Sequence, residues 1–438
     1  MQLSRNEGST MHQSTLSVPA TGGGVKGTVA VPGDKSVSHR ALILAALAPG
    51  RSTITGLSRG EDPTHTRGAL AQFGVEFADE ADGTVTVDGG LRHEAADVLD
   101  CGNAGTGIRL LAGVCAGVEG LSVLTGDEYL RQRPMGRVAD PLRQMGARVE
   151  AREGGRLAPL VIHGGNLNGI TYHSPTASAQ VKSCLLLAGL AASGSTTVVE
   201  PAPTRRHTEE MLTAAGVRVD VDGAAVTVHP GPVAPMAHTV PGDPSQSAFW
   251  AVAAALAGCV EMPGLYLGYG RKGYLHVLRR MGAAVEMEES TGTVRVSAAG
   301  LRAVEITGNE VPGIVDEIPV LAVAAAGAKG TTVISGAEEL RFKESDRVSS
   351  TVAMLRAFGV QAEERPDGMV IHGRPDGFTP AAVDSAGDHR IAMAAAVAAV
   401  ARTSGTSTIT GWGSVATSYP DFVADLRTAS GVTATVSA

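Results

Sequence analysis

Six copies of one short pattern recur along the 438-residue chain, and this repetition constrains the fold more than any other feature. In five copies, glycine stands on both sides of a five-residue run rich in β-branched residues, as in GTTVISG from Gly330. The remaining copy, GSTTVVE, ends in Glu200. Each copy predicts a strand, because β-branched residues favour strands and glycine marks the turns beside them. The copies start at Gly50, Gly120, Gly194, Gly258, Gly330 and Gly405.

A second pattern, leucine followed four residues later by glycine, keeps nearly the same spacing, as in LRQMG from Leu142 and LRRMG from Leu278. This pattern is typical of the end of an amphipathic helix. An apolar segment such as IAMAAAVAAVA from Ile391 precedes each glycine-bounded strand and predicts another, buried helix. The sequence therefore predicts six units of roughly β-α-β-α-β-β and a protein of the α/β (α+β) class.

A longer sequence repeat divides the six units into two sets of three. The segment VPGDKSVSHRALILAALA from Val31 matches VPGDPSQSAFWAVAAALA from Val240 at ten of eighteen positions. We therefore expect two similar domains, a chain that crosses between them twice, and a ligand-binding cleft between them. The expected parts are a flexible leader at 1–15, a first domain at 31–240, a second domain at 16–30 plus 241–438, and a hinge near 31–34 and 240–243.

Composition narrows the classes of function. The formal net charge of -8 argues against broad nucleic-acid binding, which requires a basic surface. No apolar run approaches the roughly 20 residues that span a bilayer, so we expect no membrane segment. The four cysteines (Cys101, Cys115, Cys184 and Cys259) lie in segments rich in small apolar residues. They predict buried thiols, no metal site and a cytoplasmic protein.

Charged residues gather where helices are predicted to begin. Helix N-termini attract anions through free N–H groups and a partial positive charge. Three such segments mix acids with lysine or arginine: GDKSVSHR from Gly33, RFKESDR from Arg341 and AGDHR from Ala386. Any one of them reads as an ordinary N-cap beside a solvated charge. Together they predict a site for one or two phosphates and a carboxylate, bound by arginine forks.

Two acids and one histidine stand out. Asp316 lies where an apolar stretch becomes a predicted buried helix, so it is either a cap or a general base. Glu344 lies between Lys343 and Arg347, and its other interpretation is an i,i+3 surface pair with Arg347. His389 could transfer protons or orient a neighbour, and the residues themselves favour neither role.

A competing motif points to a different class of enzyme. GYGRKG at Gly268–Gly273 fits the G-x-G-x-x-G pattern, and Glu288 follows at the spacing of a dinucleotide fingerprint. This would make the chain an NAD-dependent oxidoreductase. The segment is, however, the fourth copy of a repeat whose other copies lack that pattern, which weakens the dinucleotide interpretation.

Seven longer motifs occur in order along the chain: PGDKSVSHRALILAALA, NAGTGIRLL, RQRPMGRVADPLRQMGA, SAQVKSCLLLAGL, GDPSQSAF, KESDR and GDHRIAMA. With these motifs the chain resembles the 5-enolpyruvylshikimate-3-phosphate (EPSP) synthase family from about Val25 to about Leu426. The resemblance implies two hinged domains, each of three βαβαββ units in an inside-out α/β barrel. It also implies transfer of the enolpyruvyl group of phosphoenolpyruvate to the 5-hydroxyl of shikimate 3-phosphate. No motif in the sequence indicates a cofactor, and we expect a monomer.

The same resemblance implies roles for individual residues. The implied catalytic residues are Lys35, Asp316 and Glu344. Asp316 would take the proton of the 5-hydroxyl and Glu344 would protonate the enol methylene. The implied shikimate-phosphate contacts are Ser36, Arg40, Ser178, Gln180, Arg205 and Lys343. The implied phosphoenolpyruvate contacts are Lys35, Gly105, Arg133, Arg347 and Arg390, with His389 in support.

Four positions depart from the family pattern, including Ala179 in place of a second serine and Leu110 in place of a common proline. Thr417 stands where the family's better-known form has lysine, and Arg206 stands where an acid often precedes the histidine. An enolpyruvyl transferase paralogue with another phosphorylated acceptor is therefore the alternative. The sister enzymes that act on a UDP-amino sugar usually carry cysteine in the loop before the Arg-Pro pair, and GDEYLRQRP from Gly126 has none. An intact set of Lys35, Asp316 and Glu344 argues against a catalytically silent binding protein.

Overall fold

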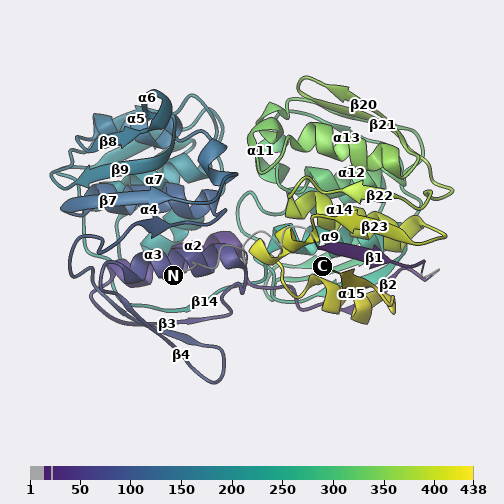
Figure 1. Cartoon of the computed structure of the whole chain (residues 1–438), viewed down its shortest axis with the longest axis horizontal. Coiled ribbons are helices and arrows are strands. Elements are labelled where there is room, and N and C mark those ends of the chain that lie inside the picture. Colours follow the sequence, from purple (N-terminus) through teal and green to yellow (C-terminus); the bar gives the residue numbers. More distant parts are fainter. Residues whose placement is uncertain (1–13, 21–22, 438) are drawn as a thin grey trace, which may run out of the picture. The chain divides into compact units, whose positions relative to one another are not determined.

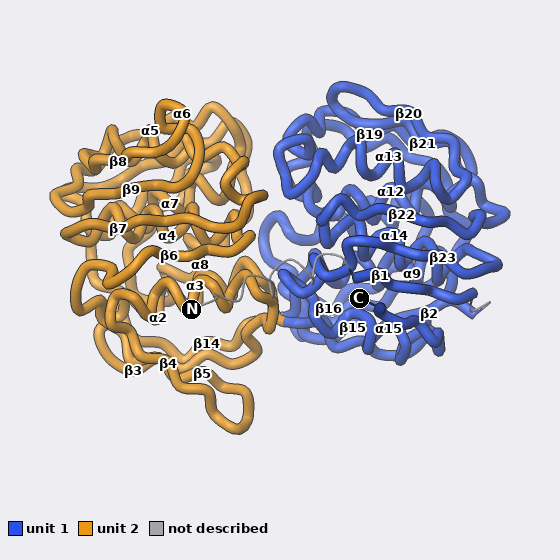
Figure 2. The backbone as a smooth tube through the Cα atoms, viewed as in Figure 1, with its two compact units in different colours: residues 1–32, 242–438 blue, residues 33–241 orange. Residues whose placement is uncertain are grey.

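The computed structural model describes residues 14–20 and 23–437, which form two compact units (Figures 1 and 2). The middle unit is Gly33–Pro241, and the outer unit joins the described residues before Gly33 to those from Gly242 onward. The chain thus passes from one unit to the other at Pro32–Gly33 and again at Pro241–Gly242. Movement about these points stays a prediction. Most of the predicted leader at 1–15 lies outside the described residues, and Thr15 already belongs to a strand.

The middle unit contains three four-stranded sheets that share one topology. In each sheet an edge strand pairs in parallel with its neighbour, and the two remaining strand pairs are antiparallel. The strand order of each sheet begins here with that parallel edge strand. The sheets, in strand order, are β14 (Ala237–Thr239), β3 (Gly50–Thr55), β5 (Val85–Gly89), β4 (Glu76–Asp79); β6 (Leu99–Asp100), β7 (Gly120–Thr125), β9 (Leu157–Gly164), β8 (Arg148–Ala151); and β10 (Thr171–His173), β11 (Thr196–Val199), β13 (Ala225–Val228), β12 (Val219–Asp222).

The outer unit repeats this arrangement with three more four-stranded sheets. The parallel pairs are again the first two strands of each sheet. The sheets, in strand order, are β2 (Val25–Thr28), β15 (Gly258–Met262), β17 (Thr293–Ser297), β16 (Ala284–Glu288); β18 (Glu305–Ile306), β19 (Thr331–Ile334), β21 (Gly368–His372), β20 (Gln361–Arg365); and β22 (Ala382–Asp384), β23 (Ser407–Thr410), β1 (Thr15–Val18), β24 (Thr435–Ser437).

Each repeat carries two main helices. The first helices are buried on nearly every side because they pack inside the unit, which explains their apolar composition. They are α2 (Lys35–Leu47), α4 (Gly105–Gly117), α7 (Ala179–Gly189), α9 (Pro244–Leu256), α12 (Ile318–Ala326) and α14 (His389–Arg402). The second helices are α3 (Glu61–Ala71), α5 (Gly136–Gln144), α8 (His207–Ala214), α10 (Gly273–Met281), α13 (Arg347–Ala357) and α15 (Phe422–Ser430). Shorter elements are η2 (Leu130–Gln132), α6 (Arg152–Gly155), α11 (Val311–Ile314), η3 (Glu338–Phe342) and η4 (Trp412–Thr417).

These elements confirm the predicted βαβαββ repeat. The glycine that ends each of the six Leu-x-x-x-Gly copies, the longer last copy included, has a positive φ, which glycine adopts without strain. These glycines are Gly74, Gly146, Gly216, Gly282, Gly359 and Gly431. At Gly258 the opening glycine is also required, because a Cβ there would overlap the Val25 carbonyl on the parallel neighbour β2. Each unit has its own hydrophobic core between its sheets and its first helices.

Distant segments complete three of the sheets. β14 comes from the end of the middle unit and pairs with β3 near its start, with Ala237 opposite Thr53. In the outer unit, β2 pairs with β15, and β1 pairs with both β23 and β24. The N-terminal strands therefore belong to the same unit as the C-terminal half of the chain (Figure 2).

One alternative loses its support and one sequence prediction is wrong. GYGRKG follows β15 and ends at the first residue of α10, and the sheet of β15 is mixed, so the motif does not belong to a parallel dinucleotide-binding sheet, which agrees with the weak standing of that interpretation. Cys259 is exposed on β15, although Cys101, Cys115 and Cys184 are buried as predicted. Cys259 faces outward because strand side chains alternate between the two faces, and its neighbour Val260 takes the buried position. Among the described residues, no helix has the length and apolar character of a membrane span.

Candidate functional site

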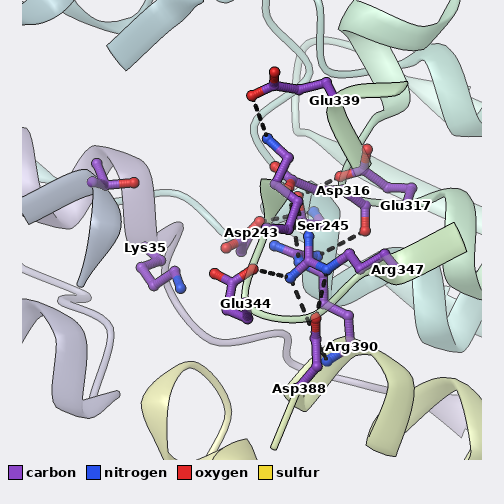
Figure 3. A network of polar contacts seen from close by, with 12 residues as sticks. Lys35, Asp243, Ser245, Asp316, Glu317, Glu339, Glu344, Arg347, Asp388 and Arg390 are labelled. Carbon is purple, nitrogen blue, oxygen red and sulfur yellow. Dashed lines mark hydrogen bonds and ion pairs between the residues drawn. The ribbon is translucent and has the colours of Figure 1, made fainter. Parts of the chain in front are cut away.

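A cluster of charged side chains in the outer unit surrounds Arg347, the first residue of α13 (Figure 3). The Arg347 guanidinium is 1 % exposed. Its Nε donates to Asp388 Oδ2 at 2.8 Å, its Nη2 donates to Glu344 Oε2 at 2.5 Å, and its Nη1 lies 3.4 Å from Asp316 Oδ1. One buried cation thus holds three carboxylates from three different segments of the unit. We call Arg347, Asp316, Glu344, Asp388 and Arg390 the Arg347 cluster.

Asp316 lies in the turn between α11 and α12. The cap position of α12 belongs to Glu317, so the interpretation of Asp316 as a cap is wrong. The Asp316 carboxylate instead lies 4.0 Å from Arg390 Nε, and its backbone carbonyl accepts from Arg390 Nη1 at 3.2 Å. Asp316 is about one-fifth exposed, so its carboxylate is open to a ligand as well as to these two cations.

The pair of Glu344 and Arg347 exists, yet it is not a surface pair, because the arginine is buried. Burial alone would lower the pKa of Arg347, but Asp388, Glu344 and Asp316 outweigh it and raise that pKa above its usual value. Burial lowers the pKa of Lys343, against the opposing effect of Asp316 and Glu339. Lys343 Nζ lies 3.5 Å from Glu339 Oε1.

The start of α14 supplies the remaining predicted residues of the outer unit. Asp388 caps this helix by accepting from Arg390 N at 2.9 Å while it also binds Arg347. His389 is buried as the first residue of the helix, between the cap and Arg390. Thr417 is buried in η4, where its hydroxyl donates to the Ser414 carbonyl at 2.7 Å.

In the middle unit, α2 begins with Lys35 and carries three predicted residues. Lys35 Nζ donates to Asp62 Oδ2 at 2.8 Å, and both side chains are mostly buried. Asp62 lies in the first turn of α3, where a negative charge is also favoured by the helix dipole. Asp34 caps α2 by accepting from Val37 N at 2.9 Å, which fixes the turn that presents Lys35 and Ser36.

Arg40 lies one turn further along α2 and is buried. Its Nη1 donates to the Ser36 carbonyl at 2.8 Å, its Nε to Thr208 Oγ1 at 2.6 Å and its Nη2 to Ser183 Oγ at 2.7 Å. Because Ser183 belongs to α7 and Thr208 to α8, the guanidinium joins three helices of the unit.

The other predicted residues of the middle unit lie on α4, α7 and the loops beside them. Ser178 caps α7, accepting from Val181 N at 3.4 Å. Gln180 Oε1 accepts from Arg109 Nη1 in a short hydrogen bond, and its Nε2 donates to Thr106 at 2.9 Å. A Cβ at Gly105 would overlap the guanidinium of Arg133, so the two residues approach each other closely. Arg205 is partly exposed in the loop before α8.

A buried ion network supports that loop. Lys182 Nζ lies 2.8 Å from Glu200 Oε2 and 2.7 Å from Glu209 Oε1, and all three side chains are at most 3 % exposed. Glu200 also accepts from Thr204 Oγ1 at 2.7 Å, which ties down the segment just before Arg205. Glu200 is the residue that breaks the glycine pattern of the repeat, so this departure has a structural reason.

Replacing Lys182 with methionine should destabilise the middle unit by about 3–5 kcal/mol, because two buried carboxylates would lose their cation. Urea denaturation followed by circular dichroism measures this loss. The matched control is Arg148→Met, because Arg148 pairs with Glu150 at the surface, where ion pairs contribute about 0–1 kcal/mol. Equal stability of the two variants would contradict the structural role of Lys182.

Within each unit, the structure brings several predicted residues together. In the outer unit it groups Asp316, Glu344, Arg347 and Arg390, with Lys343 beside them. In the middle unit, Lys35, Ser36 and Arg40 share one helix, Gly105 touches Arg133, and Ser178 and Gln180 start another helix.

The roles of the residues that hold this set in place were not predicted from the sequence. Asp62 binds Lys35, Arg109 binds Gln180, Asp388 binds Arg347, and Thr208 with Ser183 binds Arg40. Only Asp62 could have been found from the sequence, because it lies in the first turn of α3 and the second helices of other repeats also begin with charged residues. Among the described residues, no group of histidine, cysteine and carboxylate side chains could hold a metal ion.

The chain is similar in sequence to known proteins over most of its length. Residues 19–426 match the sequence profile of EPSP synthase (3-phosphoshikimate 1-carboxyvinyltransferase). The chain is 49 % identical over 420 residues to the 3-phosphoshikimate 1-carboxyvinyltransferase of Synechococcus sp. strain JA-3-3Ab, covering 92 % of this chain and 94 % of the relative. The corresponding protein of Syntrophotalea carbinolica is 46 % identical over 414 residues, covering 92 % of this chain and 96 % of the relative.

Solved structures with a similar fold are known. A structure of EPSP synthase from Acinetobacter baumannii superposes with a TM-score of 0.85 at 39 % identity, covering 97 % of this chain and 100 % of that one. The enolpyruvyl transferase NikO from Streptomyces tendae has a TM-score of 0.79 at 19 % identity, covering 97 % of this chain and 99 % of that one. At that identity the second likeness concerns the fold alone.

Proposed function

The chain belongs to the EPSP synthase (3-phosphoshikimate 1-carboxyvinyltransferase) family of transferases, and we propose that it is an enolpyruvyl transferase. In the proposed reaction, the enolpyruvyl group of phosphoenolpyruvate is transferred to the 5-hydroxyl of shikimate 3-phosphate, and phosphate is released. The observation that carries the proposal is the Arg347 cluster. Two carboxylates, those of Asp316 and Glu344, lie on one buried guanidinium, with Lys343 and Arg390 close by.

The proposed reaction is an addition followed by an elimination. The 5-hydroxyl oxygen bonds to C2 of phosphoenolpyruvate while its proton leaves and another proton adds to the C3 methylene. The resulting tetrahedral intermediate carries a methyl group, a carboxylate and a phosphate on C2. A proton then leaves the methyl group, the bond from C2 to the phosphate oxygen breaks, and phosphate departs with the bonding electrons. The reaction thus needs one base and one acid that act on different atoms.

In the outer unit, we assign the base role to Asp316 and the acid role to Glu344. Asp316 would take the hydroxyl proton, and Glu344 would protonate C3 and later accept a proton from the methyl group. Arg347 and Arg390 would bind the phosphate and carboxylate of phosphoenolpyruvate, for which guanidinium forks are well suited. Lys343 would lie beside the transferred group and stabilise the charge of the intermediate.

In the middle unit, we assign most of the acceptor binding to α2, α7 and the loop before α8. Ser36, Arg40, Ser178, Gln180 and Arg205 would hold shikimate 3-phosphate. Arg40 is already fixed by Thr208 and Ser183, so little side-chain entropy is lost when it binds an anion.

Lys35 would lie near the reacting hydroxyl and contact both substrates. Its ion pair with Asp62 limits its freedom before any substrate binds. Gly105 and Arg133 would complete the phosphoenolpyruvate site, and the absence of a side chain at Gly105 leaves room for the Arg133 guanidinium. His389 would act only by supporting Arg390, its neighbour in the first turn of α14.

The proposal predicts that purified protein releases phosphate from phosphoenolpyruvate only when shikimate 3-phosphate is present. Coupled phosphate detection with and without this acceptor tests the expectation, and shikimate lacking the 3-phosphate is the matched control. Phosphate release with no need for an acceptor would contradict enolpyruvyl transfer. Tight phosphoenolpyruvate binding without turnover would instead favour a paralogue with another phosphorylated acceptor, which is the alternative that Arg206 and Thr417 raise.

We further propose that the protein works as a monomer in the cytoplasm and needs neither metal nor organic cofactor. The proposed chemistry requires only acid, base and cationic groups, all of which the chain supplies. Analytical ultracentrifugation of the active protein and activity after treatment with chelator test the two parts. A dimer that loses activity on dilution, or an enzyme inactivated by chelator, would refute the corresponding part.

A further inference from the structure

The GYGRKG motif contains a buried arginine whose partners lie at the starts of two other helices of the outer unit. Arg271 is 3 % exposed. Its Nη2 donates to Asp243 Oδ1 at 2.8 Å, and its Nη1 donates to Ser245 Oγ at 3.0 Å. Asp243 caps α9, and Ser245 lies in the first turn of that helix. The same Nη1 lies 3.8 Å from Glu317 Oε1 at the start of α12.

Glu317 links this network to the Arg347 cluster, because it follows Asp316 directly in the chain. Ser245 Oγ donates a short hydrogen bond to Glu317 Oε1 (Figure 3). Because Arg271 Nη1 donates to the same Ser245 Oγ, the three residues form a continuous chain of contacts. Glu317 is 2 % exposed, and its position at the cap of α12 makes no side-chain cap bond. Glu317 Oε1 thus faces Ser245 and Arg271.

Asp316 and Glu317 are adjacent, yet their carboxylates contact different cations. Asp316 faces Arg347 and Arg390, whereas Glu317 faces Ser245 and Arg271. The turn that carries Asp316 and Glu317 is thus held on one side by Arg347 and Arg390 and on the other by Ser245 and Arg271. If the Arg271 side were released, the attraction of Asp316 to Arg347 and Arg390 would no longer be opposed across the turn, and its carboxylate would lose its fixed place relative to Glu344.

We propose that Arg271 is a positioning residue for Asp316, the general base of the proposed reaction. The inference rests on the proposed function for the role of Asp316. Arg271 contacts none of the reacting atoms of the proposed reaction and acts through Glu317 and Ser245. An arginine is required because its fork serves two acceptors in fixed directions, which a lysine ammonium does not reproduce.

A simpler explanation for Arg271, just before α10, would be an ion pair that stabilises the protein surface. The next residue, Lys272, shows what such a surface pair looks like. Lys272 follows Arg271 in the same motif and pairs with Glu289 at 2.6 Å, but that pair is largely exposed. Such pairs contribute little. Arg271, by contrast, is buried with two carboxylates, where removal of the cation leaves charges without compensation.

The test compares Arg271→Ala, Arg271→Lys and Lys272→Met with the unmodified protein in steady-state kinetics. Arg271→Ala should lower kcat by about 100-fold, the order of loss expected from a misplacement of about 1 Å. The KM for phosphoenolpyruvate should change less than threefold, because Arg347 and Arg390 remain. Guanidinium ion at low millimolar concentration should restore part of the kcat of Arg271→Ala, whereas Arg271→Lys should recover only a little activity. Lys272→Met should retain full activity.

The outcomes separate this inference from the proposed function. Absence of turnover in the unmodified protein would refute the proposed function. An active protein whose Arg271→Ala variant keeps its kcat would overturn the inference alone. An equal loss in kcat and in substrate binding, with no response to guanidinium, would indicate a purely structural role and also overturn it. If Arg271→Ala fails to fold by circular dichroism, Glu317→Gln decides the question, since it keeps the shape of the side chain and should lower kcat without raising KM.

Discussion

Replacing Glu344 with glutamine is expected to lower kcat by about 10²–10⁴-fold, the usual contribution of a general acid or base. Glutamine keeps the size of the side chain and an oxygen that accepts from Arg347, but it cannot deliver a proton to C3. The KM for both substrates should change little, because the cations that bind them are unchanged. Steady-state kinetics measures the loss, and incorporation of deuterium from D2O into the methylene of phosphoenolpyruvate measures the proton transfer itself.

The control for this variant is Glu338→Gln, since Glu338 is exposed on η3, a few residues before Glu344. It should retain both turnover and deuterium exchange. A Glu344→Gln protein that still exchanges deuterium at the unmodified rate would contradict the assignment of the acid to Glu344. It would move that role to another carboxylate of the Arg347 cluster.

Replacing Lys35 with methionine is expected to lower kcat/KM by about 10²–10³-fold, the effect of removing one preorganised charge from a developing anion. The loss should appear in kcat and in both KM values, because Lys35 is assigned contacts with both substrates. The ion pair with Asp62 would also disappear, leaving a mostly buried carboxylate without its cation. Kinetics combined with thermal unfolding separates the catalytic loss from any loss of stability.

Arg51→Met is the matched control in the same unit, because Arg51 is exposed on β3, which directly follows α2. Asp62→Asn provides a second comparison. It keeps Lys35 but removes its ion-pair partner, so it should reduce activity less than Lys35→Met does. Equal activity of Lys35→Met and Arg51→Met would show that Lys35 takes no part in the reaction.

Much of the fold could be predicted because the repeats are marked by residues with strong local requirements. The glycines after the second helices all need positive φ, and they mark six helix ends. The apolar first helices are buried inside each unit, as their composition predicts. The pairing of β1 with β23 and β24, and of β14 with β3, had no comparable signal. Such long-range pairing depends on tertiary packing, and the strands involved are only three to six residues long.

For the candidate site, the residues assigned to substrates could be predicted from the sequence, but the residues that hold them in place could not. Motif resemblance found the residues assigned to substrates, whereas their partners look like ordinary surface charges in sequence. Asp62, Arg109 and Arg271 are examples, because their value depends on burial and on neighbours from other helices. Asp316 illustrates the limit in another way. From the sequence, Asp316 is equally consistent with a helix cap and with a general base. The structure excludes the cap, because the N-cap position of α12 is occupied by Glu317.

Transfer of an intact enolpyruvyl group can be followed with phosphoenolpyruvate that carries ¹⁸O in the bridge between C2 and phosphorus. Addition and elimination at C2 break the bond from carbon to oxygen, so all of the bridge ¹⁸O should leave with phosphate. Mass spectrometry of the phosphate and of the carbon product after reaction with shikimate 3-phosphate gives the answer. Bridge ¹⁸O retained in the carbon product would mean cleavage between phosphorus and oxygen, and would contradict enolpyruvyl transfer.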